Sequence, residues 1–304
     1  MIRGIGYGKI IFFGEHFVVY GAPAIAGGIS SSAIVEVKKS DKNRIITDQK
    51  VVQELSLNGI QRVLTSLGVT HKYDVHLKGD LPTYGGLGSS AAFCVALTRA
   101  IAQENDVSLT DEEINRHAYE GEKAFHGNPS GIDNIMATYG GVVEFKRGKT
   151  QSENKFELLH IKKPLHLVIS FSGKYSATAK MVEGVRKFKE QDGLEFSQLM
   201  DEYLDLLVEG RKSLENGDIK EIGKLMDSNQ SLLSEIGVSD ELNDKIIEVA
   251  REEDALGAKV TGGGGGGCCI ALAKNTAHAD QIAEKLKGAG FDSFCAKIAE
   301  KGHK

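Results

Sequence analysis

Two carboxylates flank a short turn in this chain of 304 residues. Glu122 stands near the end of a predicted helix, and Asp133 follows the turn Gly-Asn-Pro-Ser-Gly at residues 127–131. Such a turn can fold both carboxylates toward one pocket, where one side chain holds a metal ion and the other handles a proton. A solvated helix residue at Glu122 and a helix N-cap at Asp133 would explain the same spacing without chemistry.

A glycine-rich segment with two serines leads into another predicted helix. Residues 82–90 read Pro-Thr-Tyr-Gly-Gly-Leu-Gly-Ser-Ser, and an Ala-rich helix is predicted over residues 89–104. Glycines let the backbone approach a ligand, and a helix N-terminus favours phosphate. Ser89 and Ser90 supply hydroxyls that cap the helix or hold a metal ion. A plain glycine-rich turn with a serine N-cap is the alternative; the segment is neither a Walker A loop nor a dinucleotide-binding motif.

A lysine and a run of six glycines complete the candidate chemistry. Lys9 opens an apolar run that ends in Gly14, Glu15 and His16. A lysine in a buried strand needs a partner, so Lys9 either reaches the surface or lies near a phosphate or carboxylate. Glu15 and His16 are candidate contacts for a small hydroxylated substrate. The glycines at 262–267 raise the entropy cost of ordering, which favours close approach to a ligand as their purpose.

These residues must be positioned by helices and strands. The N-terminal half is predicted to be rich in strands and to contain two helices. Three runs are strand-like, at residues 9–13, 33–38 and 72–78. One helix is predicted over residues 89–104. The second begins at Thr110, whose capping box with Glu113 predicts a helix that runs to about Lys123.

After Pro164 the predicted secondary structure changes from a β-rich to a helix-rich pattern. A strand is predicted near residues 165–171, followed by three or four helices with apolar residues at helical spacing. Two strands then flank the glycine run, and a helix near 276–287 and a strand near 291–298 end the pattern. This change places a boundary near residues 160–165. We therefore expect domains at 1–162 and 163–304.

Composition excludes several classes of partner. The chain has 37 basic and 42 acidic residues, a net charge of −5, and no basic block, which argues against nucleic acid and anionic membranes. The N-terminus lacks the pattern of a secretory signal, and no apolar stretch is long enough to span a membrane. The four cysteines lack metal-ligand spacing, and adjacent Cys268 and Cys269 are expected in the core. We expect a soluble, cytoplasmic protein.

Taken in order, these segments resemble the motifs of the GHMP kinases, which phosphorylate small metabolites with ATP. The first motif corresponds to residues 8–21, the second to residues 82–92 with the core Gly-Leu-Gly-Ser-Ser-Ala-Ala, and the third to residues 259–268. Residues 122–134 resemble the helix and loop that carry the metal and catalytic carboxylates of the family. Residues 229–239 are similar to a segment of the mevalonate kinase branch. The resemblance covers essentially the whole chain.

Four positions depart from the pattern of the family. Tyr7 replaces the usual proline before Gly8, Tyr84 replaces a glycine of the second motif, and Gly263 replaces an alanine of the third. Ala179 stands where a lysine is often found after Thr178. None of the residues proposed for chemistry is affected.

The resemblance implies an α+β fold with two domains. The N-terminal domain would resemble the ribosomal S5 domain 2-like fold, and the C-terminal domain would be ferredoxin-like with extra helices. The active site would lie in the cleft between the domains, where ligand pockets commonly occur.

The resemblance also implies a role for each candidate residue. Asp133 would accept or orient the proton of the substrate hydroxyl, and Lys9 would pair with Asp133 and neutralise charge on the transferring phosphoryl group. Ser90 and Glu122 would hold Mg²⁺, while ATP serves as co-substrate. The residues expected to cradle ATP are Pro82, Gly85, Gly86, Leu87, Gly88, Ser89 and Ser90. The residues expected to contact the substrate are Glu15, His16, Ser130 and Thr261.

The implied reaction is ATP-dependent phosphorylation of the primary hydroxyl of mevalonate, giving 5-phosphomevalonate and ADP on the route to isoprenoids. Two alternatives stay open: a related kinase acting on phosphomevalonate, homoserine or a sugar, and a catalytically silent ATP-binding sensor. Residues 229–239 and the Gly-Glu-His segment favour mevalonate, and intact Lys9, Glu122 and Asp133 argue against a sensor. A homodimer is expected from the resemblance alone.

Overall fold

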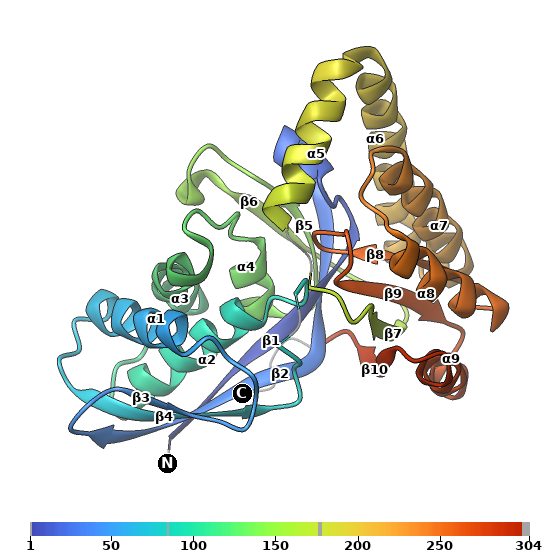
Figure 1. The fold of residues 1–304 in the computed structure, drawn as a ribbon. Coiled ribbons are helices and arrows are strands. Elements are labelled where there is room, and N and C mark those ends of the chain that lie inside the picture. The colour runs from blue at the N-terminus through green and yellow to red at the C-terminus, as the bar shows by residue number, and fades with distance from the viewer. Residues whose placement is uncertain (1, 84, 176–177, 300–304) are drawn as a thin grey trace.

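The computed structural model describes residues 2–83, 85–175 and 178–299, and its strands form two sheets (Figure 1). Within this part of the chain the first sheet has six strands in the order β3-β4-β2-β5-β6, with β1 paired to β2. Its strands are β1 (Ile2–Phe13), β2 (Ala24–Ser40), β3 (Arg44–Ile46), β4 (Lys72–Gly79), β5 (Val142–Lys146) and β6 (Lys155–Leu159).

Close packing of helix α2 (Ser89–Glu104) on strand β1 sets the position of the phosphate-loop candidate. A Cβ atom on Gly4 would lie 2.0 Å from the carbonyl oxygen of Ala96, and one on Gly6 would lie 2.0 Å from that of Ala92. Glycine is therefore required at both positions, because it lets the helix backbone lie directly against the strand. The N-terminus of α2 consequently lies beside the middle of β1.

Four α-helices gather beside the first sheet in the described residues (Figure 1). The predicted helix over 89–104 is confirmed as α2 (Ser89–Glu104), and the capping box of Thr110 and Glu113 is confirmed at the start of α3 (Asp111–His126). The expectation of two helices in this half is wrong, because α1 (Gln53–Ser66) and α4 (Ile132–Tyr139) are also present. Neither begins with a side-chain cap in the described structure, so both lack the usual N-terminal signal. Short 3₁₀ turns occur at Phe17–Tyr20 and Gln151–Glu153.

The second sheet is antiparallel, with the order β10-β7-β9-β8. Its strands are β7 (His166–Phe171), β8 (Gly257–Thr261), β9 (Cys268–Ala273) and β10 (Asp292–Lys297). Its helices are α5 (Thr178–Gln191), α6 (Gly193–Asn216), α7 (Ile219–Glu235), α8 (Glu241–Glu252) and α9 (Thr276–Gly288). Asp192, Asp218, Asp240 and Asn275 cap four of these helices by accepting a backbone N–H, which explains where they begin.

The two halves meet along β1 and β8. The backbone N–H of Ile11 donates to the hydroxyl of Thr261 at 2.8 Å, and an isolated bridge joins Ile29 to Ile298.

The expected α+β class is confirmed, and Cys268 and Cys269 are buried as expected. The boundary between residues 162 and 163 stays a prediction and falls between β6 and β7. Among the described helices, none combines the length and apolar character needed to cross a bilayer.

Candidate active site

Lys9 and Asp133 form an ion pair where β1, the glycine segment and α4 meet. Lys9 is only 4% exposed, and its Nζ lies 3.3 Å from Oδ1 of Asp133, whose side chain keeps 29% exposure. The backbone N–H of Lys9 donates to the carbonyl oxygen of Leu87 at 2.9 Å. A Cβ on Gly88 would lie 3.0 Å from Cγ of Lys9, so glycine at 88 lets the loop close over this pair. The cation thus has a carboxylate partner and does not reach the surface.

Ser90 and Glu122 also come together, from the first turn of α2 and the last turns of α3. The hydroxyl of Ser90 donates to Oε1 of Glu122 at 2.8 Å, and Nδ1 of His126 lies 2.6 Å from the same oxygen. Glu122 is fully buried, which excludes the solvated alternative, and its Oε2 has no hydrogen-bond partner within the described chain. An oxygen buried in this way is suited to a cation that completes its coordination.

Burial dominates the electrostatics of this pair. It raises the pKa of the Glu122 carboxyl, while the hydrogen bond and charge of His126 oppose that rise. The pKa of His126 is raised in turn, chiefly by its hydrogen bond to Glu122. The nearby Asp133 charge raises both pKa values further. The Asp133 charge thus opposes ionisation of Glu122, and a cation beside these carboxylates would favour the ionised form of Glu122.

The glycine segment forms an anion-binding geometry at the N-terminus of α2. Gly88 is the N-cap residue with φ 69°, and within the described residues no side chain caps the helix. The N–H groups of the first turn are thus free of capping side chains, and they coincide with the positive end of a 16-residue helix. Ser89 is not the N-cap; its hydroxyl donates to the carbonyl oxygen of Pro82 at 2.6 Å and closes the loop on itself. Tyr84 lies outside the described residues.

A small cavity of about 170 Å³ opens beside the two serines. Half of the side chains in its wall are apolar or aromatic. It is lined by Lys50, Val51, Val52, Ser56, Leu77, Thr83, Ser89, Ser90, Phe93 and Phe125. An aromatic base could stack there while its phosphates reach the N-terminus of α2.

The segment after β1 is tied to the second sheet. Lys259 of β8 pairs with Oε1 of Glu15, and both side chains are fully buried. Nε2 of His16 lies 2.9 Å from the carbonyl oxygen of Gly263. Because a carbonyl only accepts, Nε2 carries the proton, and Nδ1 is left as a buried acceptor without a partner in the described structure.

Burial also governs these titratable groups. It raises the pKa of Glu15, although Lys259 opposes the rise, and it lowers the pKa of Lys259. Burial lowers the pKa of His16 as well, which favours the neutral imidazole. Glu15 therefore has a protein partner, and its position favours an indirect role beside His16.

Thr261 and Ser130 occupy different surroundings. The Thr261 hydroxyl accepts from the N–H of Ile11 at 2.8 Å and lies in the third glycine segment, where Gly262 approaches Gly86. Ser130 belongs to the turn into α4: its hydroxyl accepts from the N–H of Ile132 at 3.4 Å. Its carbonyl oxygen accepts from Nδ2 of Asn154 at 2.7 Å. Ser130 thus helps to shape the turn that presents Asp133.

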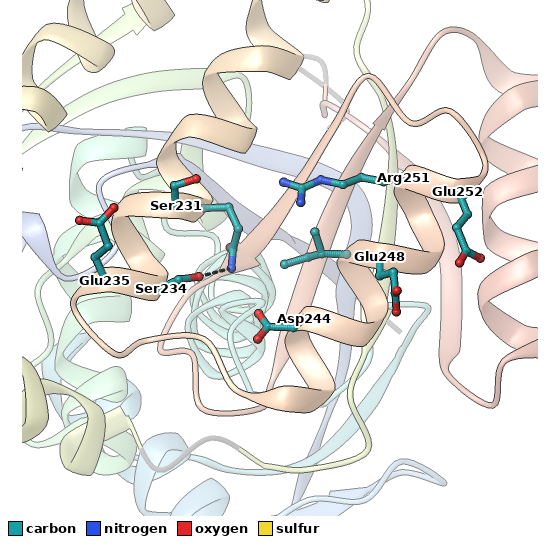
Figure 2. A pocket seen from close by; sticks show the side chains of 9 residues that line it. Ser231, Ser234, Glu235, Asp244, Glu248, Arg251 and Glu252 are labelled. Atoms are coloured by element: carbon teal, nitrogen blue, oxygen red, sulfur yellow. Dashed lines mark hydrogen bonds between the residues drawn. The ribbon is translucent and has the colours of Figure 1, made fainter.

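A second cavity, larger than the one beside the serines, lies away from these residues. About 820 Å³ in volume, it lies between α7 and α8, and its walls carry mostly polar and acidic side chains (Figure 2). It is lined by Gln230, Ser231, Ser234, Glu235, Asp244, Ile247, Glu248, Arg251 and Glu252. Since no predicted site residue lines it, size alone does not identify the site of chemistry.

Sequence reasoning assigned no role to Lys259 or His126. Lys259 carried the same signal as Lys9, a lysine within an apolar strand, and its partner Glu15 is 244 positions away. His126 follows Glu122 by one helical turn, a spacing that places both side chains on one face. The contact of Lys259 with Glu15 could be found only from the tertiary fold. The contact of His126 with Glu122 could have been predicted from their spacing in the sequence.

Comparisons with known proteins agree with this geometry. Residues 54–141 match the family model of the GHMP kinases N terminal domain, and residues 211–292 match that of the GHMP kinases C terminal. The chain is 32% identical to a mevalonate kinase of Aeropyrum pernix, over 99% of this chain and 97% of that protein. It is also 32% identical to a mevalonate kinase of Pyrococcus furiosus, over 97% and 96% of the two chains.

Among solved structures, the fold is similar to the crystal structure of L. major mevalonate kinase in complex with R-mevalonate. The TM-score is 0.91 with 34% sequence identity, and the match covers 97% of this chain and 95% of the other. A mevalonate kinase of Methanococcus jannaschii matches with a TM-score of 0.82 and 26% identity over 98% of each chain. The two-domain architecture expected from the sequence motifs is thereby confirmed.

Proposed function

Because the chain belongs to the GHMP kinases and, within them, to the mevalonate kinases, we propose that it transfers the γ-phosphoryl group of ATP to the primary hydroxyl of mevalonate. The products are 5-phosphomevalonate and ADP. The observation that carries the proposal is the Lys9–Asp133 pair, placed beside the Ser90–Glu122 pair at the mouth of a glycine-rich phosphate loop. Each pair supplies a separate requirement of phosphoryl transfer.

The nucleotide lies along the second glycine segment in this proposal. The first-turn N–H groups of α2 and the backbone of Gly85, Gly86, Leu87 and Gly88 bind the phosphates, while Pro82 and Ser89 hold the shape of the loop. The base occupies the cavity of about 170 Å³ that Phe93 and Phe125 help to line. Gly86 lets the loop lie close to the third glycine segment, since a Cβ atom on this residue would lie 3.2 Å from the carbonyl oxygen of Thr261.

The metal proposal is Mg²⁺ at Ser90 and Glu122. The hydroxyl and carboxylate oxygens fit a hard cation, and the orphaned Oε2 of Glu122 gives a specific reason for one. In the described part of the chain, no group of three or more His, Cys, Asp or Glu side chains could hold a metal. Phosphate and water oxygens would complete the coordination of Mg²⁺ beside Ser90 and Glu122. When bound, Mg²⁺ supplies charge neutralisation to the phosphates. His126 helps to hold Glu122 through the same oxygen that Ser90 contacts.

Asp133 and Lys9 act on the reacting hydroxyl. Asp133 accepts a hydrogen bond from the primary hydroxyl, which orients the oxygen toward the phosphoryl group and takes its proton as the new bond forms. The Lys9 ammonium, held by β1 and buried, keeps Asp133 in place and stabilises the charge of the transferring group. Correct alignment of the two reactants can contribute about 7–11 kcal/mol to lowering the barrier.

The substrate proposal places mevalonate between His16 and Asp133. His16 offers a neutral Nδ1 acceptor, and Thr261 and Ser130 contribute hydroxyls from the third glycine segment and the turn before α4. Glu15 supports His16 through its ion pair with Lys259. Cytoplasmic location remains a prediction from composition, and a homodimer remains a prediction of the family resemblance.

A coupled ADP-release assay with Mg²⁺ and ATP tests this function on the purified chain. The acceptors are mevalonate, phosphomevalonate, homoserine and galactose, each alone. We expect turnover with mevalonate only. Turnover with another acceptor would correct the substrate and keep the kinase chemistry, whereas ATP binding without turnover for all four would support a silent sensor.

A further inference from the structure

The third glycine loop, residues 262–267, consists of six glycines and has no side chains that could hold its backbone conformation. Within it φ is 87° at Gly262, 67° at Gly264, 62° at Gly265, 105° at Gly266 and 67° at Gly267. Glycine adopts these values without steric cost, but it also has the largest freedom to leave them. The conformation of the loop must therefore be imposed by its surroundings.

Backbone hydrogen bonds from two neighbouring segments provide part of this support. The N–H of Gly265 donates to the carbonyl oxygen of Val238 at 2.8 Å, and the N–H of Gly267 donates to that of Lys174 at 2.8 Å. The N–H of Ser172 donates to the carbonyl oxygen of Gly267 at 2.9 Å. These bonds connect the loop to the end of β7 and to the turn before α8, and no side chain takes part in them.

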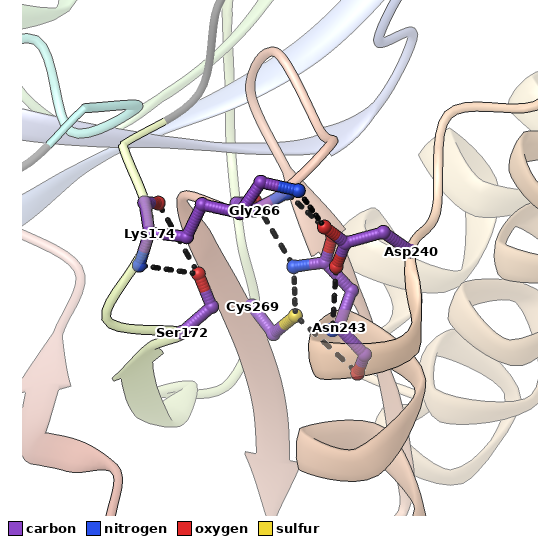
Figure 3. A network of polar contacts seen from close by, with 6 residues as sticks. All are labelled: Ser172, Lys174, Asp240, Asn243, Gly266 and Cys269. Carbon is purple, nitrogen blue, oxygen red and sulfur yellow. Dashed lines mark hydrogen bonds and ion pairs between the residues drawn. The ribbon is translucent and has the colours of Figure 1, made fainter.

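One side chain, that of Asn243 in the first turn of α8, completes the support (Figure 3). Its Oδ1 accepts from the N–H of Gly266 at 3.0 Å, and its Nδ2 donates to the carbonyl oxygen of the same residue at 3.0 Å. Asn243 is fully buried. A side-chain amide can donate and accept at once over this reach, which an aliphatic or carboxylate side chain of the same size cannot do.

The far end of the same loop lies at the candidate active site. The carbonyl oxygen of Gly263 is the partner of His16 at 2.9 Å. A Cβ on Gly262 would lie 3.0 Å from the Cα of Gly86 in the phosphate loop. A change in the loop at Gly266 would thus be transmitted within three or four residues to the substrate side and the nucleotide side of the cleft.

We propose that Asn243 is a positioning residue for phosphoryl transfer, because its amide clamps Gly266 and thereby holds the third glycine loop against His16 and Gly86. The proposal rests on the proposed kinase function for its kinetic consequence. The clamp itself is independent of which acceptor the enzyme phosphorylates. Small displacements of a positioning element are sufficient to slow transfer, since about 1 Å of misplacement can cost about 100-fold in rate.

The test compares full-length wild type with Asn243→Leu, which keeps the number and branching of the side-chain heavy atoms and removes both hydrogen bonds. Lys174→Met is the matched control, because it breaks the exposed ion pair of Lys174 with Asp240 and leaves the carbonyl oxygen that bonds Gly267. For Asn243→Leu we expect kcat/KM for mevalonate to fall by between about 10-fold and 100-fold. We also expect faster backbone hydrogen exchange at residues 263–267, and neither change in Lys174→Met.

Two results would overturn the proposal: unchanged loop exchange in Asn243→Leu, or faster exchange with unchanged kcat/KM. If Asn243→Leu fails to fold, Asn243→Ser is measured in the same way, since the shorter hydroxyl cannot bond both groups of Gly266. If wild type phosphorylates a different acceptor, the assigned substrate fails, and the kinetic comparison is made with that acceptor. If wild type turns over no acceptor, the kinase function and the positioning role both fail, while the exchange rates still report whether the clamp exists.

Discussion

Lys259 and Glu15 form a fully buried ion pair that joins the second sheet to the loop after β1. Lys259 also donates to the carbonyl oxygens of Val260 at 2.7 Å and Ile11 at 3.5 Å. Glu15 has no further partner for Oε2 among the described residues. The pair is therefore asymmetric, because the cation keeps other acceptors if the carboxylate is removed, whereas the carboxylate depends on the cation.

This asymmetry predicts unequal effects on stability. Lys259→Met should lower the free energy of unfolding by about 3–5 kcal/mol, because it leaves a buried carboxylate unpaired. Glu15→Gln should cost less, and the double variant should recover much of the loss of Lys259→Met. Urea denaturation of the four proteins measures the cycle. Equal and additive single effects would show that the two side chains are not coupled.

Replacement of Lys9 tests the proposed charge stabilisation. Lys9→Met keeps the buried apolar stem and removes the ammonium, so kcat should fall by about 10²–10³-fold. Steady-state ADP release with saturating ATP gives the value, and circular dichroism checks the fold. Lys78→Met, which removes an exposed partner of Glu36, is the matched control and should retain full activity. Comparable activity in the two variants would remove Lys9 from the chemistry.

Glu122→Gln tests the proposed metal site. Glutamine can still accept from Ser90 and His126 but lacks the charge, so half-maximal turnover should require about 10-fold more Mg²⁺ or higher. Titration of ADP release with Mg²⁺ at fixed ATP measures this. Glu120→Gln, two positions earlier and paired with Lys123, serves as the control. A Mg²⁺ dependence that matches wild type in Glu122→Gln would assign the metal elsewhere.

The buried Glu122–His126 contact also predicts a pH dependence of stability without Mg²⁺. The pKa values of both groups are raised in the folded protein, so the native state binds more protons than the unfolded state. This stabilising contribution is complete below the unfolded pKa values and is lost as pH rises through the folded ones.

Wild type should therefore lose stability relative to Glu122→Gln between about pH 5 and pH 8. Denaturation curves of both proteins across this range, recorded with chelator present, measure the difference. A stability difference that is constant with pH would contradict the burial argument.

Local signals in the sequence were sufficient to predict much of the fold. The capping box at Thr110 predicted α3, and the Ala-rich composition after Ser89 predicted α2, since both signals lie within a few positions of the helix. Helix α4 was missed because it has eight residues and begins after Gly131 without a side-chain cap in the described structure. Short helices of this kind depend on tertiary packing more than on local sequence.

For the candidate site too, some residues could be predicted from the sequence, whereas one of their contacts could not. Motif spacing and family resemblance brought Lys9, Glu122 and Asp133 together, and the structure places Lys9 beside Asp133 at 3.3 Å. The partner of Glu15 could not be predicted, because Lys259 lies 244 positions away and no local pattern connects them. Contacts of this length follow from how the two sheets pack.

The most direct test of the central claim is mevalonate-dependent ADP release by Asp133→Asn, compared with wild type under saturating Mg²⁺ and ATP. Asparagine keeps the size of the side chain but cannot take the hydroxyl proton. We predict rapid formation of 5-phosphomevalonate by wild type and a kcat lower by about 10²–10⁴-fold in folded Asp133→Asn. Wild-type turnover by the folded variant would contradict the assignment of Asp133 and, with it, the proposed mechanism.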